Sequence, residues 1–164
     1  MAAKKKKSKV PGDVVASNRR ARHDYTILDT YEAGVQLVGT EVKSLRDGKA
    51  SLAEAFCTID DGEVWLRNLH IPEYSQGHWT NHSPRRVRKL LLHRREIDSL
   101  TGKVRDGNRT LIPLTLYFKN GLLKCELGLA EGKQAHDKRE AIKRRTAERE
   151  VVRELGRRVK GIRA

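Results

Sequence analysis

The side chains best suited to metal binding or nucleophilic catalysis are too scattered in this sequence to form either kind of site. The chain has six His and two Cys, and none of them has the spacing of a zinc site. His78 and His82 are four residues apart, but Gly and Pro flank their segment, so the spacing does not define one face of a helix. The sequence contains neither a GxSxG motif nor a phosphate-binding lysine loop. We therefore expect no metal, no cofactor, no small-molecule substrate and no enzymatic activity.

The two cysteines, Cys57 and Cys125, alternate with apolar residues in strand-like runs. This pattern is typical of thiols that pack as small apolar side chains in a core. Cysteines that are far apart and lack a disulfide framework are typical of a reducing compartment, and no apolar run is long enough to span a membrane. We expect a cytoplasmic protein without a membrane partner.

Basic side chains are concentrated at the two ends of the chain. The net charge is +14 over 164 residues, of which residues 1–22 carry +7 and residues 131–164 carry +6. Residues 23–130 are therefore almost neutral, at +1. Basic segments attached to a nearly neutral body predict a polyanionic partner. Segments that only keep the protein soluble are the alternative.

Within the body, basic residues are concentrated just before the acid Glu96. They are Arg85, Arg86, Arg88, Lys89, Arg94 and Arg95. Such a run indicates contact with nucleic acid, and a solvated helix face is the alternative. RNA is favoured over duplex DNA because no helix-turn-helix or zinc finger is visible. Four aromatic side chains are candidates for stacking on bases, although packing is the simpler role for each: Trp65, Tyr74, Trp79 and Tyr117.

The elements that would position these groups begin with a long strand. Apolar residues alternate from Tyr25 to Leu37, which predicts a strand with one buried face. Gly34 within it predicts a bulge or a bend. Thr40 as a cap and Gly48 as a stop then predict a short helix between them.

Two hairpins are predicted from alternating apolar residues on both sides of turn sequences. The first covers residues 55–66 and turns at residues 60–62, Asp-Asp-Gly. The second covers residues 109–130 and turns at residues 120–121, Asn-Gly. Pro113 cannot donate a backbone hydrogen bond, so it predicts a sheet edge or a bulge.

Between the hairpins, residues 84–100 give the clearest helical pattern. Ser83 is a plausible cap and Pro84 a plausible first-turn residue. An apolar stripe at helical spacing predicts the buried face: Val87, Leu90, Leu91, Ile97 and Leu100. The basic run then falls largely on the other faces of this helix.

The order of these elements predicts a mainly β protein. A small closed antiparallel barrel of the OB type, flanked by one short and one long helix, is the favoured fold. A flat sheet covered by one helix is the alternative, since periodicity does not distinguish them. We divide the chain into a basic disordered arm, an RNA-binding body and a basic C-terminal tail: residues 1–17, 18–131 and 132–164.

The tail is rich in good helix formers but has only a thin apolar stripe. An isolated helix of this kind is marginal in water. We expect the tail to be disordered alone and to become helical when a polyanion neutralises its like charges.

Four segments of the sequence together resemble the SmpB family. They are NRRARHDY, EAGVQLVGTEVKSLRDGKA, NHSPRRVRKLLLH and GKQAHDKR, which begin at residues 18, 32, 81 and 132. The resemblance runs in register over residues 18–145. SmpB proteins are bacterial SsrA-binding proteins, that is, proteins that bind transfer-messenger RNA (tmRNA).

This resemblance implies an OB-fold body that binds the tRNA-like domain of tmRNA. It implies trans-translation, the rescue of ribosomes stalled on messages without a stop codon. In that family the protein takes the place of the anticodon arm that tmRNA lacks, and the complex is delivered with EF-Tu. The resemblance further implies that the tail enters the empty mRNA channel next to the vacant A site and becomes helical there.

The resemblance also implies roles for individual residues. Glu32, Leu91 and Lys124 match residues that hold tmRNA, as acceptor, apolar contact and phosphate partner. The helical pattern alone would put Leu91 in the core. To this set we add four members of the basic run: Arg85, Arg86, Arg88 and Lys89. Asn18, Arg19 and His23 match the segment that faces 16S rRNA at the decoding centre. The tail residues expected in the mRNA channel are Lys133, His136, Asp137, Lys138, Arg139, Lys143, Arg144 and Arg145.

Two departures from the family pattern concern the tail alone. Gln134 stands where the family often has Lys, and the tail lacks an aromatic residue that some members have. Two further functions remain open on the residues alone. A general single-strand RNA-binding module or ribosomal protein would bind any RNA with a steep salt dependence. An RNA-modifying enzyme would need a catalytic group of residues that is not visible.

Overall fold

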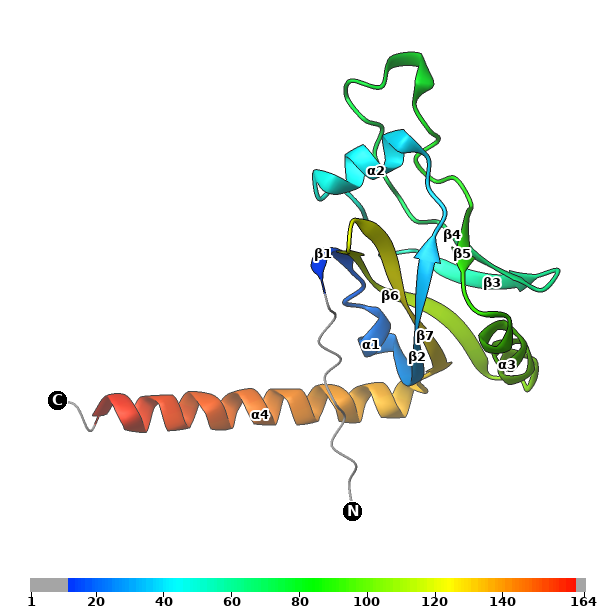
Figure 1. Cartoon of the computed structure of the whole chain (residues 1–164). Helices are drawn as coiled ribbons and strands as arrows, with labels where there is room; N and C mark the ends of the chain where they lie inside the picture. Colours follow the sequence, from blue (N-terminus) through cyan, green and yellow to red (C-terminus); the bar gives the residue numbers. More distant parts are fainter. Residues whose placement is uncertain (1–11, 162–164) are drawn as a thin grey trace. The chain divides into compact units, whose positions relative to one another are not determined.

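The computed structural model describes residues 12–161 of the chain. They divide into two compact units, with the boundary between Glu131 and Gly132. The first unit holds a sheet and three α-helices, and the second is built on one long helix (Figure 1). In chain order the elements are β1 (Asp13–Ser17), α1 (Ala21–Asp24), β2 (Tyr25–Val35), α2 (Gly39–Arg46), β3 (Phe56–Asp60), β4 (Glu63–Arg67), the 3-10 turn η1 (His78–Thr80), β5 (Arg88–Leu91), α3 (Arg94–Arg105), β6 (Arg109–Lys119), β7 (Leu122–Gly132) and α4 (Ala135–Gly161).

The strands pair mostly antiparallel, in the order β1-β6-β3-β4-β5-β2-β7, and β6 also pairs with β7. The last pairing closes β6, β3, β4, β5, β2 and β7 into a ring, with β1 attached to β6. The mainly antiparallel sheet with several helices was predicted. A flat sheet with two free edges would not have this closing pair.

Both predicted hairpins are confirmed. Asp61 and Gly62 join β3 to β4 with φ angles of 51° and 71°, and Asn120 and Gly121 join β6 to β7 with 53° and 76°. Positive φ at two successive turn residues matches the right-handed twist of the strands, and Asn, Asp and Gly tolerate it best. The register of β6 and β7 shifts after Pro113, so the predicted bulge is present.

The predicted helix over residues 84–100 is wrong in its first half. Residues 88–91 form the strand β5, which pairs with β4 and β2, and the helix α3 starts only at Arg94. Burial in β5 follows a period of two, because Arg88 and Leu90 face inward while Leu91 faces outward. A buried arginine at an inward position breaks the apolar alternation that identifies a strand, so the leucines alone suggested a helix.

The predicted N-terminal arm is also shorter than expected. Residues 13–17 form β1, which pairs with β6 from Asp13 to Ser17. Their sequence, DVVAS, contains two β-branched valines, which favour an extended chain. Residues 1–11 lie outside the described part of the chain.

The core lies inside the ring. It is built from leucines and other apolar residues of the strands, with Leu45 from α2 and Leu100 from α3 fully buried. Cys57 and Cys125 belong to this core as predicted, and burial raises the pKa of both thiols, that of Cys125 to about 12. They are therefore neutral packing groups and not nucleophiles.

The second unit contains α4, 27 residues long. Its apolar side chains Ile142, Val151, Val152 and Leu155 are all exposed. A helix with exposed apolar residues and a high positive charge lacks the packing that normally stabilises helices. Disorder of the tail alone therefore stays a prediction, with a test given below. None of the helices in residues 12–161 combines the length and apolar character that crossing a membrane requires.

Candidate nucleic-acid interface

The segment before β2 carries the residues predicted to face the decoding centre. The buried Asn18 side chain accepts a hydrogen bond from the Ala21 N–H at 3.1 Å and donates one to the Pro113 carbonyl at 3.4 Å. Asn18 thereby fixes the start of α1 against β6. Arg19 beside it is exposed. His23 lies on α1 with its Nδ1 2.9 Å from Asp24 Oδ1, and 43% of its side chain is exposed.

A surface cavity of about 470 Å³ opens beside this end of β2. It is lined on one side by the α1 segment and on the other by residues 53–56, which lead into β3, and by β6. The exposed ring of Phe56 contributes an apolar wall, and Arg20 and Asp24 contribute charged groups. Of the three residues predicted to face the decoding centre, Asn18 lines this cavity.

The C-terminal half of β2 carries Glu32, whose carboxylate is held in place. It accepts a hydrogen bond from the Tyr117 hydroxyl and one from Lys119 Nζ at 3.2 Å. The bond from Tyr117 is the main cause that lowers the pKa of Glu32 below its ordinary value of 4.5, against the opposing effect of burial. Lys119 and Lys124 lower this pKa further. The carboxylate is thus ionised at neutral pH, and 38% of the side chain still reaches solvent.

Tyr117 is the residue that joins this group together. It pairs with Lys124 across β6 and β7, which brings the predicted phosphate partner next to Glu32. Burial raises the pKa of Tyr117, and the Glu32 carboxylate raises it further, so the phenol keeps its proton and remains a donor. The sequence did not identify this role. Its signal was that Tyr117 lies out of phase with the apolar positions of its strand.

Leu91 lies on the outer surface of the strand ring. The family resemblance implied a surface position for it, whereas the helical pattern had placed it in the core. Its side chain is 53% exposed, whereas that of its neighbour Leu90 is buried. It stands opposite Gly34 of β2. Glu32 and Gly34 are two residues apart on one strand, so Glu32, Gly34 and Leu91 share one face. We call this face, with Lys124, the β2 outer face.

The four basic residues that were added to the predicted tmRNA contacts, three arginines and one lysine, all form ion pairs with acidic side chains. Arg85 pairs with Glu54 at 3.1 Å, Lys89 with Glu63 at 2.5 Å, and Arg86 and Arg88 with Glu41 at 2.8 and 2.7 Å. Arg88 is fully buried and also donates to the carbonyls of Leu69, Arg86 and Pro84. The expectation that Arg88 contacts RNA is therefore not retained, because its donors all point inward.

Glu41 is the centre of this ion-pair network. It lies in the first turn of α2, is fully buried, and also accepts a hydrogen bond from the Val38 N–H at 3.0 Å. Burial raises the pKa of Glu41, but hydrogen bonds from Arg86 and Val38 and the charges of Arg88 and Arg86 together bring it below its ordinary value. The network fixes α2 against β5, and so fixes the strand that carries Leu91.

The comparisons with known proteins decide the family. The family model described as SmpB protein matches residues 15–157. The chain belongs to the SmpB family. Curated relatives of this SmpB-family chain are named SsrA-binding protein. That of Corynebacterium efficiens is 73% identical over all of both chains, and that of Corynebacterium diphtheriae is 72% identical over 99% of both. One from a Mycobacterium species, strain KMS, is 76% identical over 91% of this chain and 89% of its own.

A solved structure is similar to this SmpB-family chain as well. It is described as "tmRNA-SmpB: a journey to the center of the bacterial ribosome". The two chains are 53% identical, with a TM-score of 0.63 and coverage of 77% of this chain and 92% of the other. The likeness extends well beyond the fold, since more than half of the aligned residues are the same.

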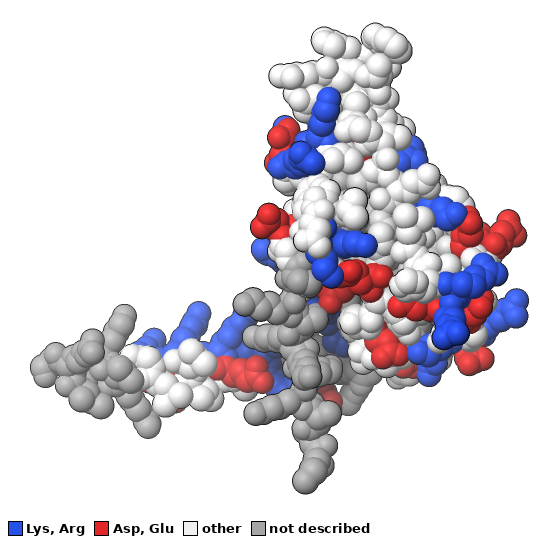
Figure 2. Space-filling model, in the orientation of Figure 1, with Lys and Arg blue, Asp and Glu red and all other residues white. Residues whose placement is uncertain are grey.

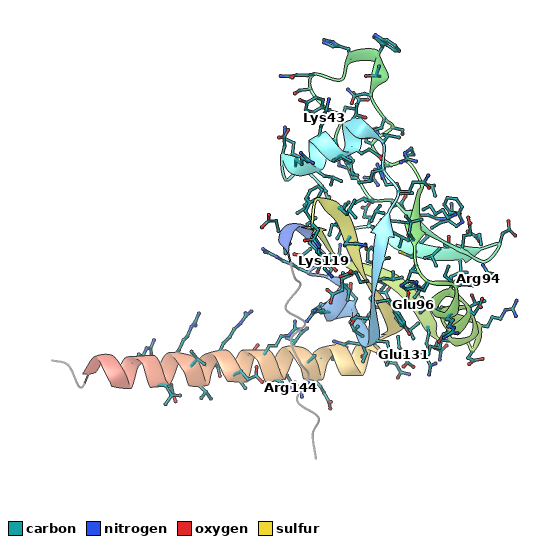
Figure 3. All side chains as sticks on the ribbon, viewed as in Figure 1. Lys43, Arg94, Glu96, Lys119, Glu131 and Arg144 are labelled. Atoms are coloured by element: carbon teal, nitrogen blue, oxygen red, sulfur yellow. The ribbon has the colours of Figure 1, made fainter. Side chains whose placement is uncertain are left out.

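The predicted tail residues lie in or just before α4. Arg139, Lys143, Arg144 and Arg145 are exposed, and Lys133 is partly buried before the helix begins. The side chains of His136, Asp137 and Lys138 lie outside the described residues. Within the described part of α4, basic side chains therefore face solvent along the helix, as Arg144 does in Figure 3.

Proposed function

We propose that this chain is the adaptor of ribosome rescue that binds tmRNA and presents it to stalled ribosomes. The β2 outer face binds the tRNA-like domain, and the opposite end of β2 faces the decoding centre. In this account the strand ring is an OB-type barrel that replaces the missing anticodon arm. The relatives' name, SsrA-binding protein, and the description of the similar structure support the choice of partner.

The observation that carries the proposal is the separation of two groups along one strand. Asn18, Arg19 and His23 precede Tyr25, the first residue of β2, and Glu32 follows seven residues later. At ~3.3 Å per residue, Tyr25 and Glu32 lie roughly 23 Å apart along β2, and the first group lies before Tyr25. A rigid strand with a different contact surface at each end can transmit position from one RNA to another, which is what a tRNA mimic requires.

The chemistry of the β2 outer face suits RNA. The ionised Glu32 accepts hydrogen bonds from base edges or a 2′-OH, which phosphate cannot donate. Leu91 offers apolar surface to an unstacked base, and Lys124 offers charge to phosphate. One acidic acceptor between an apolar contact and a cation gives discrimination that a purely basic surface lacks.

The tail completes the proposed mechanism. A helix of 27 residues is about 40 Å long at ~1.5 Å per residue, long enough to enter a channel walled by rRNA. An mRNA that still fills the channel would exclude it. Occupancy of the channel would thus distinguish translating from stalled ribosomes without any reading of sequence. EF-Tu delivery and cytoplasmic location belong to the same proposal.

Separation-of-function variants test this account. Leu91→Ala should weaken binding to the tRNA-like domain, and Arg19→Ala with His23→Ala should leave that binding unchanged. Both should reduce peptide transfer to tmRNA on ribosomes stalled without a stop codon. Arg95→Ala, at an exposed position of α3, is the matched control and should change neither. If Leu91→Ala and the Arg19→Ala, His23→Ala chain weakened tmRNA binding equally, the two groups of residues would not have the separate roles proposed for them.

A further inference from the structure

The most exposed large apolar side chain in the described residues is Trp79. Its side chain is 92% exposed, and the next in order, Val152, is 68% exposed. Trp79 lies in η1, at the tip of the loop of residues 72–83. An indole left in water forgoes the stabilisation that burial of a large aromatic ring gives. We therefore ask which partner outside the chain covers this ring.

The loop that carries Trp79 is held in one shape by its own hydrogen bonds. The Asn81 side chain accepts from the Tyr74 N–H at 2.9 Å and donates to the Tyr74 carbonyl at 2.7 Å, which closes the loop at its base. Thr80 Oγ1 donates to the Gly77 carbonyl at 2.6 Å. A β-carbon on Gly77 would lie 2.8 Å from the Asn81 side chain, so a larger residue there would displace Asn81 from its bonds to Tyr74. The tip is therefore prearranged to present the ring.

The loop is also anchored to α2. Ser44 Oγ donates to the Pro72 carbonyl at 2.8 Å. The buried His82 ring lies 3.0 Å from the Ile71 carbonyl through Nε2 and 3.0 Å from Thr40 Oγ1 through Nδ1. Because a carbonyl only accepts, Nε2 carries the proton and, in the neutral ring, Nδ1 accepts from the threonine hydroxyl. The loop and α2 thus form one rigid projection.

This projection lies at the end of β2 that carries the proposed tmRNA contacts. The strand runs toward α2, and the loop lies beyond α2 (Figure 1). Three residues separate the end of β2 at Val35 from the start of α2 at Gly39. Arg19 and His23, at the other end of the strand, are remote along the chain from this projection. A partner of Trp79 is therefore sought in the RNA bound at this end.

The surroundings of Trp79 favour one nucleobase as its partner. Residues 74–83 contain no Lys, Arg, Asp or Glu, and the tip is free of charged atoms in the space-filling view (Figure 2). Gln76, His78 and Thr80, around the indole, are exposed and polar. A contact with another protein would need an apolar patch around the indole ring. Stacking on a nucleobase needs only the exposed ring itself.

A cation stands at the base of the same projection. Lys43 of α2 lies with its Nζ 5.5 Å from the centre of the Tyr74 ring, below the loop (Figure 3). It is exposed and therefore available to a phosphate next to the stacked base. Charge and stacking are thus supplied by different residues, which makes them separable by experiment.

We propose that Trp79 stacks on an unpaired base of the tRNA-like domain of tmRNA. This inference rests on the proposed function, because it takes its RNA partner from it. An aromatic ring can stack on any base. Trp79 therefore adds affinity and fixes the orientation of the bound RNA, while the β2 outer face distinguishes this RNA from others. Loss of the ring should weaken binding about ten-fold, within the usual range for one stacked base.

The test uses the Trp65→Phe chain, in which Trp79 is the only tryptophan. Its fluorescence is followed during titration with the tRNA-like domain, and binding is measured independently with labelled RNA. We expect quenching with the same midpoint as binding. Trp79→Leu should weaken binding, Trp79→Phe should weaken it less, and Gln76→Ala, a control on the same tip, should have no effect. Lys43→Gln should reduce the slope of log Kd against log salt, and Trp79→Leu should leave it unchanged.

The outcomes separate this inference from the proposed function. Tight RNA binding with unchanged Trp79 emission and full affinity of Trp79→Leu would overturn the stacking contact and leave the proposed function intact. Quenching by ribosomes alone, and not by the tRNA-like domain, would assign the ring to a different partner and also overturn it. Failure of the unaltered chain to prefer this RNA over tRNA would overturn the proposed function.

Discussion

Leu91 of β5 lies directly opposite Gly34 of β2, and a β-carbon at position 34 would come within 3.3 Å of the Leu91 β-carbon. The glycine therefore leaves room for the leucine on the outer surface of the ring. Leu91 is 53% exposed although it lies on a strand that is paired with β2. This arrangement makes the position of Leu91 dependent on its neighbour.

The first prediction concerns this pair. Leu91→Ala and Gly34→Val should each weaken binding to the tRNA-like domain, the first by removing the apolar contact and the second by displacing it. Leu91→Ala should change the free energy of unfolding by less than about 1 kcal/mol, because its side chain is half exposed. Leu90→Ala, one residue away and buried, should cost about 2–5 kcal/mol. Urea unfolding and RNA titration measure the two effects, and full RNA affinity of Leu91→Ala would contradict the assignment.

The second prediction concerns the hydrogen bond from Tyr117 to Glu32. Tyr117→Phe removes the main cause of the lowered pKa of Glu32, so this pKa should return toward 4.5. A carboxylate with a lowered pKa stabilises the fold above about pH 4.5, and that contribution is lost as the pH falls through the folded value. The variant should therefore lose part of this pH dependence and weaken RNA binding.

An NMR titration of the Glu32 carboxyl carbon measures this change. Tyr31→Phe is the control, because its hydroxyl is bonded to Lys103 and not to Glu32. An unchanged Glu32 pKa in Tyr117→Phe would show that Lys119 and Lys124, and not Tyr117, keep the pKa of this carboxyl below its ordinary value.

The third prediction concerns the buried network around Glu41. Glu41→Gln removes the charge that neutralises the buried Arg88, which should destabilise the fold by about 3–5 kcal/mol. Glu54→Gln, which breaks an exposed pair with Arg85, should cost less than about 1 kcal/mol. Because the pKa of Glu41 is lowered in the folded chain, its stabilisation is present above about pH 4.5 and lost in more acidic solution. Urea unfolding at several pH values measures this, and equal costs for both variants would rule out a special role for Glu41.

The fourth prediction concerns the tail. Deletion from Gly132 onward should leave unfolding of the first unit and binding to the tRNA-like domain largely intact, while rescue of stalled ribosomes should be lost. The isolated tail, residues 132–164, should show weak helical circular dichroism that rises when a polyanion is added. Loss of tmRNA affinity on deletion would place the boundary between body and tail elsewhere.

The sequence predicted the local elements best where backbone chemistry is decisive. Both hairpins followed from Asn-Gly and Asp-Gly turns, and the bulge followed from Pro113. The helix over residues 84–100 failed because Arg88 is buried by long-range pairing with Glu41, 47 residues away, which no local pattern reveals. The support of Glu32 by Tyr117 was also not visible, since the two residues are 85 positions apart in sequence.

The outer position of Leu91 shows how the candidate site was found. Apolar periodicity placed it in the core, and only the resemblance to a family placed it on the surface. The four basic residues selected for their charge were, in contrast, paired with acids. The ion pairs depend on strand pairing that the sequence does not display, so charge composition alone did not show that Arg88 is buried. RNA contact by Arg85, Arg86 and Lys89 stays a prediction.

The most direct test of the central claim is a competition titration. The labelled tRNA-like domain of tmRNA is bound to the full chain at near-physiological salt, and excess unlabelled tRNA is added. We predict that binding is retained, because the proposed contacts of Glu32 and Leu91 with this RNA do not depend on charge alone. Displacement by tRNA as readily as by any other polyanion would contradict the account and favour a general RNA-binding protein.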